Sequence, residues 1–362
     1  MARSRIRDLG IHIGVLPTGA FNAITDVPGV KVGHSTLISG EGLLKPGLGP
    51  VRTGVTAILP HGQNLFREKV CAAVYTINGY GKACGFEQVR ELGLLESPIA
   101  LTNTLNVGLV LDALVQEAVH HNPDIGISTS SVNIVVGETN DGFLNDIQGR
   151  HVRAEHVWAT LHEASDGPVP EGAVGAGTGT MCFGWKGGIG VSSRVLPDEA
   201  GGFTLGVLVQ TNFGNPQDLI VAGFPLGRRL RPAEHRPEIL GGGSVMVVMA
   251  TDAPLRSDQL RRLCVRAGAG LARTGSYYGH GSGDFVIAFS TAYRIDHDSG
   301  NPAGGLDNQI ESPKVLNGLF QAVVEAVEEA VLNSLCCAET MIGRDNHLAE
   351  ALPLDQMMEM LK

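Results

Sequence analysis

The chain has 362 residues, of which 43% are hydrophobic and 18% are charged, and its formal net charge is −10 at pH 7. This composition supports a sizeable core and excludes a disordered chain. An acidic chain without a cluster of Lys and Arg is a poor partner for nucleic acid. No apolar stretch reaches the ~20 residues that span a bilayer, so we expect no membrane partner.

The six cysteines are scattered, and the twelve histidines show no metal-ligand spacing. Scattered thiols without a C-x-x-C motif are typical of a reducing compartment. The charged residues 1–8 are not followed by an apolar signal core. We therefore expect a cytoplasmic protein, and the histidine pattern gives no support for a metal site.

In chain order, short apolar runs bounded by Gly and Pro predict strands, and longer periodic runs predict helices. The predicted elements are strands 55–59 and 72–76, helix 105–120, strands 134–136, 188–191, 205–209 and 245–250, a helix from 257 to about 273, strand 285–289 and helix 316–335. Several strands are apolar throughout, as expected for strands that are buried on both faces.

The three helices differ in pattern. Helix 105–120 has few charges, which predicts a buried helix. Ser257 is a candidate cap for the next helix, and Gly275 suits its end. In the last helix, the Leu and Val residues line one face and the other face carries glutamates, namely Glu325, Glu328 and Glu329.

No strand-loop-helix unit with phosphate-binding glycines recurs, so we prefer layered sheets covered by helices, an α/β (α+β) protein, to a Rossmann sheet. No linker divides the chain, which predicts one catalytic domain over 1–362. The stretch 228–243 is rich in Arg, Pro, His and Gly and is predicted to be an exposed loop. No G-x-S-x-G, P-loop or H-E-x-x-H motif is present.

This loop ends at Gly241-Gly242-Gly243-Ser244, where the apolar run 245–250 begins. One interpretation is a glycine turn entering a strand. The other is a self-cleaving junction, because a serine hydroxyl can attack the preceding carbonyl and glycine leaves the backbone free to adopt the required geometry. The α-amine released at Ser244 would have a pKa of ~7.7–8.0 and could act as the base for the same residue's hydroxyl.

Further motifs support the second interpretation. The chain resembles the DmpA and β-peptidyl aminopeptidase family, the L-aminopeptidase/D-esterases, along nearly its whole length. The motifs that carry the resemblance, besides Gly243-Ser244, are residues 24–34, 93–99 with 101–104, 137–142 with 144–146, 175–179, 210–214 and Gly281-Ser282-Gly283-Asp284.

The resemblance implies a four-layer αββα sandwich with layers like those of the N-terminal nucleophile hydrolases and a DmpA-type connectivity. It implies autocatalytic cleavage into an α chain, 1–243, and a β chain, 244–362. It also implies a homo-oligomer, often a tetramer, that uses no metal or cofactor.

Roles follow from the matching motifs. Ser244 matches the nucleophile, and Ser282 and Asp284 match a serine and an acidic residue that hold the nucleophile and its amine. Asn212 matches the asparagine that stabilises the oxyanion. Without the resemblance, Ser282-Gly283-Asp284 would be interpreted as a solvated turn and Asn212 as the end of a strand.

On the substrate side, Glu138 matches an acidic position near the substrate's amino group, although a surface carboxylate at a strand end is an equally good interpretation. Asn140 stands where some relatives carry tyrosine, a second oxyanion donor. Lys82 follows Asn78-Gly79-Tyr80-Gly81, where many relatives carry an acidic residue, and a reversed charge there would change substrate preference.

The function expected from these residues is hydrolysis of a small peptide, amino-acid amide or ester with a free amine, including β-amino-acid peptides and D-amino-acid esters, through an acyl-enzyme on Ser244. One alternative is a self-cleaving N-acyltransferase of the ornithine acetyltransferase type, although those enzymes use threonine at the junction. The other is an uncleaved, non-catalytic relative.

Overall fold

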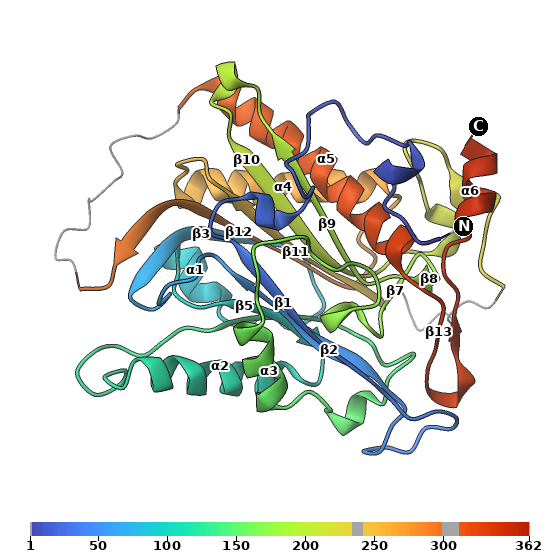
Figure 1. Ribbon diagram of the computed structural model, residues 1–362, viewed down its shortest axis with the longest axis horizontal. Coiled ribbons are helices and arrows are strands. Elements are labelled where there is room, and N and C mark those ends of the chain that lie inside the picture. The colour runs from blue at the N-terminus through green and yellow to red at the C-terminus, as the bar shows by residue number, and fades with distance from the viewer. Residues whose placement is uncertain (1, 234–241, 299–310, 362) are drawn as a thin grey trace.

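The computed structural model describes residues 2–233, 242–298 and 311–361. Two sheets lie face to face between two pairs of helices, giving four layers (Figure 1). The smaller sheet has four strands in the order β1-β2-β5-β6, with the bounds β1 (Lys31–Ser39), β2 (Val51–Leu59), β5 (Ile99–Asn103) and β6 (Val135–Thr139).

The larger sheet has six strands in the order β4-β3-β12-β11-β10-β9. Its central pair, β11 and β12, is parallel, and β10 runs antiparallel to β11. The strands are β3 (Glu68–Gly79), β4 (Leu94–Leu95), β9 (Ile189–Val195), β10 (Thr204–Asn212), β11 (Gly242–Thr251) and β12 (Gly281–Asp296).

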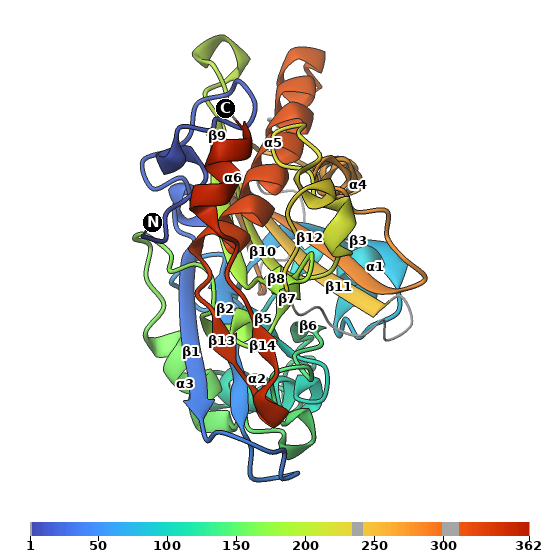
Figure 2. The same ribbon diagram turned by 90° about the vertical axis from the view of Figure 1, so that its right-hand side faces the viewer.

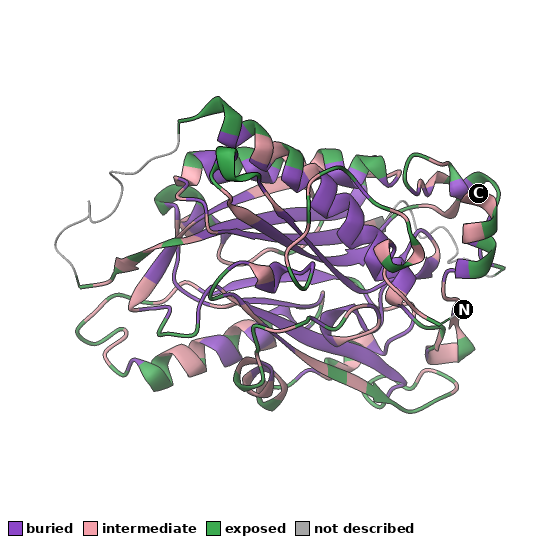
Figure 3. Ribbon diagram, turned by 45° about the horizontal axis from the view of Figure 1, so that its top comes forward, coloured by how far each residue is buried: buried purple, intermediate pink, exposed green. Residues whose placement is uncertain are grey.

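Helices cover the outer face of each sheet. Helices α4 (Ser257–Arg273) and α5 (Pro313–Cys337) pack on the six-stranded sheet, and α2 (Val107–His121) and α3 (Ala154–His162) pack on the four-stranded sheet. Inner strands such as β2, β6 and β10 are almost entirely buried, whereas α2 and α4 present an exposed outer face (Figure 3). This arrangement confirms the predicted αββα layers.

Strand β11 shows why its sequence is apolar at every position. Val245, Val247 and Met249 pack in the core beneath α4 and α5, whereas Met246 and Val248 pack in the core between the two sheets. Alternate side chains of a strand point to opposite faces, so a strand in an inner layer needs apolar residues throughout.

Two predictions about helices were wrong in part. Helix α2 buries only one face, formed by Val107, Val110, Ala113 and Leu114, and the rest of the helix is partly or fully exposed. Ser257 begins α4 but does not cap it, because the N-cap residue is Arg256, whose N–H donates to the Gln259 side chain at 3.1 Å. The end of α4 before Gly275, with φ of +104°, is as predicted.

The glutamates of α5 are buried, not solvent-facing. Glu325, Glu328 and Glu329 are 3%, 1% and 0% exposed. Arg194, which is fully buried on β9, donates to Glu325 at 3.1 Å and to Glu329 at 2.7 Å, and Arg273 pairs with Glu328 at 2.5 Å. Buried carboxylates need such partners, and the partners come from distant parts of the chain.

The carboxyl-terminal segment contacts the four-stranded sheet. Its short hairpin, β13 (Met341–Ile342) with β14 (Leu348–Ala349), runs alongside the four-stranded sheet (Figure 2). The Arg52 Nε donates to the carbonyl of Ile342 at 2.8 Å, which joins this hairpin to β2. The smaller elements are α1 (Phe86–Leu92), α6 (Leu354–Leu361), β7 (Met181–Cys182) and β8 (Trp185–Lys186).

Half of the predicted loop 228–243, residues 234–241, lies outside the described residues. Within its described part, Leu230 and Pro232 are buried and β11 already begins at Gly242, so these positions differ from the predicted exposed loop. In the described ranges, none of the helices is apolar and long enough to cross a membrane.

Candidate active site

The Gly243–Ser244 junction lies within a strand of the larger sheet. Ser244 is opposite Asn212 on β10 and opposite Gly283 on β12, and Gly243 is opposite Ser282. Strand β10 ends where β11 and β12 begin, so the register gathers four predicted site residues at one edge of the sheet: Asn212, Ser244, Ser282 and Asp284.

The hydroxyl group of Ser244 points toward the carbonyl of the preceding residue, Gly243. Its Oγ donates to the carbonyl oxygen of Gly243 at 2.6 Å, and the residue is 6% exposed. A methyl group at Gly243 would lie 3.1 Å from Phe213 Cα and 3.4 Å from Ser282 Oγ. The nucleophile candidate therefore touches the peptide unit that precedes it, in a space that suits glycine.

Ser282 and Asp284 form a pair beside the junction. Ser282 Oγ donates to Asp284 Oδ1 at 2.7 Å, and both residues are buried. The second carboxylate oxygen, Oδ2, has no hydrogen-bond partner among the described residues. Burial raises the pKa of Asp284 to about 6, although the Ser282 hydroxyl opposes this shift.

The amide of Asn212 is fixed on one side only. Its Oδ1 accepts a hydrogen bond from the Met181 N–H at 3.2 Å, and its buried Nδ2 has no partner in the part of the chain that the structure describes. Residues directly opposite each other in an antiparallel pair lie on the same face of the sheet. Asn212 therefore holds an unused donor on the face of the sheet that Ser244 occupies.

The carboxylate of Glu138 reaches the same region from the other sheet. Glu138 lies near the end of β6, is 2% exposed, and accepts hydrogen bonds from the Lys82 N–H at 3.0 Å and from the Thr104 hydroxyl. A methyl group at Gly81 would lie 3.2 Å from Glu138 Oε1 and 3.3 Å from Gly283 Cα. The carboxylate thus lies close to the strand residue that pairs with Ser244.

Two residues predicted to shape the pocket are exposed. Asn140 follows β6, and its Oδ1 accepts a hydrogen bond from the Gly142 N–H at 2.9 Å. Lys82 contributes its backbone N–H to Glu138 while its side chain is exposed. The roles of both side chains stay predictions.

Sequence reasoning missed residues that support the site. Thr104 is part of the motif 101–104, but its bond to Glu138 joins the residue after β5 to β6 and leaves no sequence signal. Lys186 did leave one, because it is a lone charge in the apolar, glycine-rich run Cys182-Phe183-Gly184-Trp185-Lys186-Gly187-Gly188. A charge in such a run indicates a buried cation.

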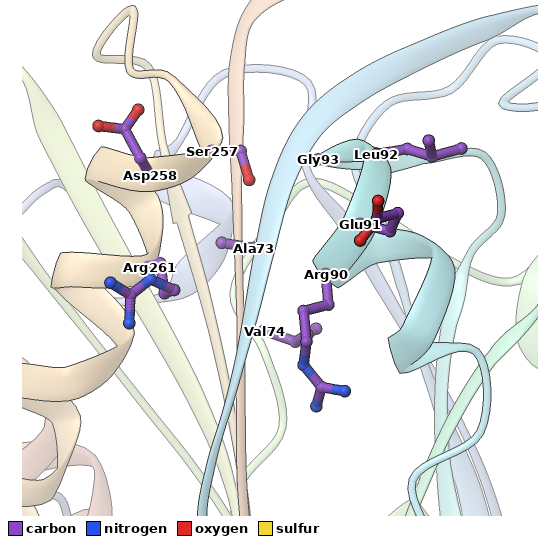
Figure 4. Close-up of a pocket in the computed structure, with 9 residues that line it drawn as sticks. All are labelled: Ala73, Val74, Arg90, Glu91, Leu92, Gly93, Ser257, Asp258 and Arg261. Carbon is purple, nitrogen blue, oxygen red and sulfur yellow. The ribbon is translucent and has the colours of Figure 1, made fainter.

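A separate surface pocket of about 330 Å³ lies between α1 and α4, beside the middle of β3 (Figure 4). None of the predicted site residues lines it. Its lining residues are Ala73, Val74, Arg90, Glu91, Leu92, Gly93, Ser257, Asp258 and Arg261. The junction instead lies near the end of β3, where Asn78 pairs with Asp284.

Comparison with known proteins identifies close relatives. The family model for peptidase family S58 matches residues 22–349. The beta-peptidyl aminopeptidase BapA of Sphingosinicella microcystinivorans is 42% identical over 372 residues, which cover 99% of this chain and 92% of that protein.

Two solved structures have the same fold. The PH0078 protein of Pyrococcus horikoshii OT3 superposes with a TM-score of 0.94 and 49% identity over 99% of each chain. The L-aminopeptidase D-Ala-esterase/amidase of Ochrobactrum anthropi, a prototype for the serine aminopeptidases and a variant of the Ntn hydrolase fold, superposes with a TM-score of 0.88 and 39% identity over 98% of this chain and 96% of that one. The resemblance predicted from the motifs is confirmed.

Proposed function

The chain belongs to peptidase family S58 and is an aminopeptidase, and from this premise we propose that it cuts itself between Gly243 and Ser244 and then uses Ser244 as an N-terminal nucleophile. The observation that carries the proposal is the 2.6 Å hydrogen bond from Ser244 Oγ to the Gly243 carbonyl, beside the unused donor of Asn212. The hydroxyl contacts the carbonyl group that it would attack.

Self-cleavage would begin when Ser244 Oγ adds to the carbonyl carbon of Gly243. The negative charge that develops on the carbonyl oxygen would be stabilised by Asn212 Nδ2, a buried donor without a partner among the described residues. Breaking the C–N bond moves the acyl group from the nitrogen to Oγ and frees the amine of Ser244. Water then hydrolyses the ester and leaves the pieces 1–243 and 244–362.

In turnover, the freed amine would take the proton of the Ser244 hydroxyl as Oγ attacks the substrate carbonyl. Its reference pKa of ~7.7–8.0 suits this role near neutral pH. The Ser282–Asp284 pair, which lies opposite Gly243 and Val245, would stabilise the protonated amine. The leaving group departs with a proton, and water releases the acyl group from Ser244.

Glu138 would bind the ammonium group of the substrate. It is an acidic side chain at the junction, and its two hydrogen bonds hold it without a cationic partner among the described residues. An anion in this position explains why a free amine would be required. The names of the relatives support peptides with N-terminal β-amino acids, as well as D-amino-acid esters and amides, as substrates.

The test is intact mass spectrometry under denaturing conditions of the wild type, Ser244→Ala and the matched control Ser128→Ala, which alters an exposed loop serine. We expect two pieces and aminopeptidase activity for the wild type and the control. Ser244→Ala is expected to give one 38.0 kDa chain without activity. An active wild type that stays whole would contradict the proposal. Cytoplasmic location and homo-oligomeric assembly stay predictions of the sequence.

A further inference from the structure

Lys186 on β8 is a buried cation that the mechanism above does not use. Its side chain is fully buried, and its Nζ donates to three backbone carbonyls, those of Gly177 at 3.0 Å, Thr180 at 2.9 Å and Gly187 at 2.6 Å. Across the described ranges, no acidic side chain lies within ion-pair distance of it. A buried charge without a counter-ion is costly and is often functional.

Burial has the expected electrostatic consequence for this side chain. It lowers the pKa of Lys186 to about 7. The nearby Cys182 thiol does not compensate the charge, because burial raises the pKa of that thiol to about 12 and keeps it neutral. Three donated hydrogen bonds require three protons on Nζ, which only the ammonium form carries, so the positive charge acts on the three carbonyl partners.

One of these carbonyls leads directly to the active site. The peptide unit between Thr180 and Met181 accepts a hydrogen bond from Lys186 Nζ on its oxygen and donates one from its N–H to Asn212 Oδ1. The same Asn212 amide carries the unused donor Nδ2 at its other end. A chain of two hydrogen bonds thus joins the ammonium group to the proposed oxyanion donor.

Each of these hydrogen bonds makes the next donor group stronger. A cation on a carbonyl oxygen makes the N–H of the same peptide a better donor, and a donor on Oδ1 makes the Nδ2 protons of the amide more positive. These two hydrogen bonds also fix the orientation of the Asn212 side chain, since a flipped amide would bring its oxygen toward the developing negative charge. Both effects favour the state in which the carbonyl oxygen becomes an oxyanion.

We propose that Lys186 is a positioning residue that orients and polarises Asn212 for oxyanion stabilisation, both in self-cleavage and in turnover. This inference rests on the proposed function. It extends the site from the edge of the six-stranded sheet to the β7–β8 hairpin, which the sequence did not assign to the site.

The test compares Lys186→Met, which removes the charge in a side chain of similar length, with Asn212→Ala and the double variant. Self-cleavage of fresh precursor and the kcat and KM of processed enzyme are measured. We expect Lys186→Met to slow self-cleavage and kcat by about 10-fold, less than the ~10²–10³-fold typical of losing an oxyanion donor, with KM within twofold. In the Asn212→Ala background, Lys186→Met should cause no further slowing.

The matched control is Lys314→Met, which alters an exposed lysine and should leave both rates unchanged. If Lys186→Met does not yield folded protein, Lys186→Gln provides the same comparison, because it keeps donor protons but loses the charge. Folded Lys186 variants with rates within twofold of the wild type would overturn the inference. So would an equal slowing in the presence and absence of Asn212, which would indicate a merely structural role.

The two proposals fail in different ways. A wild-type chain that stays whole overturns the proposed function and this inference with it. A wild type that is cut and active, beside a Lys186→Met variant that is equally fast, overturns the inference alone.

Discussion

At the scale of single residues, Asp284 is the buried group whose charge matters most to the site. Burial raises its pKa to about 6, whereas an unfolded chain would give ~3.9. The folded state therefore prefers the protonated carboxyl. The stability that this preference provides is fully present below pH ~4 and is lost as the pH rises through about 6.

This linkage predicts a pH-dependent effect of Asp284→Asn, measured in the Ser244→Ala background so that no amine is freed. Asn resembles the neutral carboxylic acid and can still accept from Ser282. We expect the substitution to raise the free energy of unfolding by up to about 3 kcal/mol at pH 8 and to change it little at pH 4. Urea unfolding at the two pH values measures the difference, and an equal effect at both would show that Asp284 is not held protonated.

Glu138 gives a prediction that separates substrate binding from self-cleavage. The precursor offers no ammonium group at the junction, so Glu138→Gln should leave self-cleavage unchanged. The same variant should reduce kcat/KM for substrates with a free amine by about 10- to 100-fold, since a hydrogen bond to a charged group contributes about 1.5–3 kcal/mol. Glu155→Gln on the exposed side of α3 is the control. Slow self-cleavage in Glu138→Gln would assign the carboxylate a different role.

The sequence predicted which residues of the site to examine but not how they are held. Ser244, Ser282 and Asp284 stand beside glycines at the starts of apolar runs, and that pattern is visible locally. The Lys186–Thr180 and Met181–Asn212 bonds depend on how β7 and β8 pack against β10, which no local pattern records. Asn212 could therefore be recognised as a candidate, whereas its support could not.

At the scale of elements, α5 packs closely against β9. A methyl group at Gly190 would lie 1.9 Å from the carbonyl oxygen of Ala330, a backbone atom that cannot move aside. We therefore expect Gly190→Ala to lower the free energy of unfolding by at least about 2 kcal/mol, the cost of overpacking a tight interface. Urea unfolding of both proteins in the Ser244→Ala background is the measurement.

The control is a glycine in an open position. Gly108 is exposed in α2, and a methyl group there would meet no atom within 4 Å. Gly108→Ala should raise the free energy of unfolding by about 0.5–1 kcal/mol, because alanine loses less backbone entropy in a helix. If both substitutions had the same sign, the close packing of α5 on β9 would not be the cause.

The α5 helix also shows where periodicity stops being informative. Its apolar stripe correctly predicted a helix, and its glutamates were correctly placed off that stripe. The pattern could not reveal that Glu325 and Glu329 meet Arg194, which lies 131 and 135 positions earlier in the chain. A helical pattern of apolar residues predicts which face of the helix is polar. Whether that polar face meets solvent or a buried partner depends on the fold.

At the scale of the whole molecule, the proposed cut falls between strands that remain interleaved. Most of β11 and all of β12 follow the proposed cut, but their outer neighbours in the sheet, β10 and β3, precede it. Helix α5, also from the later segment, packs on β9 and β10. The two pieces would share the six-stranded sheet and the cores on both of its faces, so neither piece could complete that sheet without the other.

This interleaving predicts that the processed protein behaves as one folding unit. On size exclusion without denaturant, 1–243 and 244–362 should elute together at the position of uncut Ser244→Ala, and they should separate only in denaturing buffer. Thermal unfolding of the cut protein should show a single transition, because losing β11 and β12 exposes both cores that they join. Two transitions, or a free 244–362 piece under native conditions, would mean that the halves hold separate cores, contrary to the strand order observed.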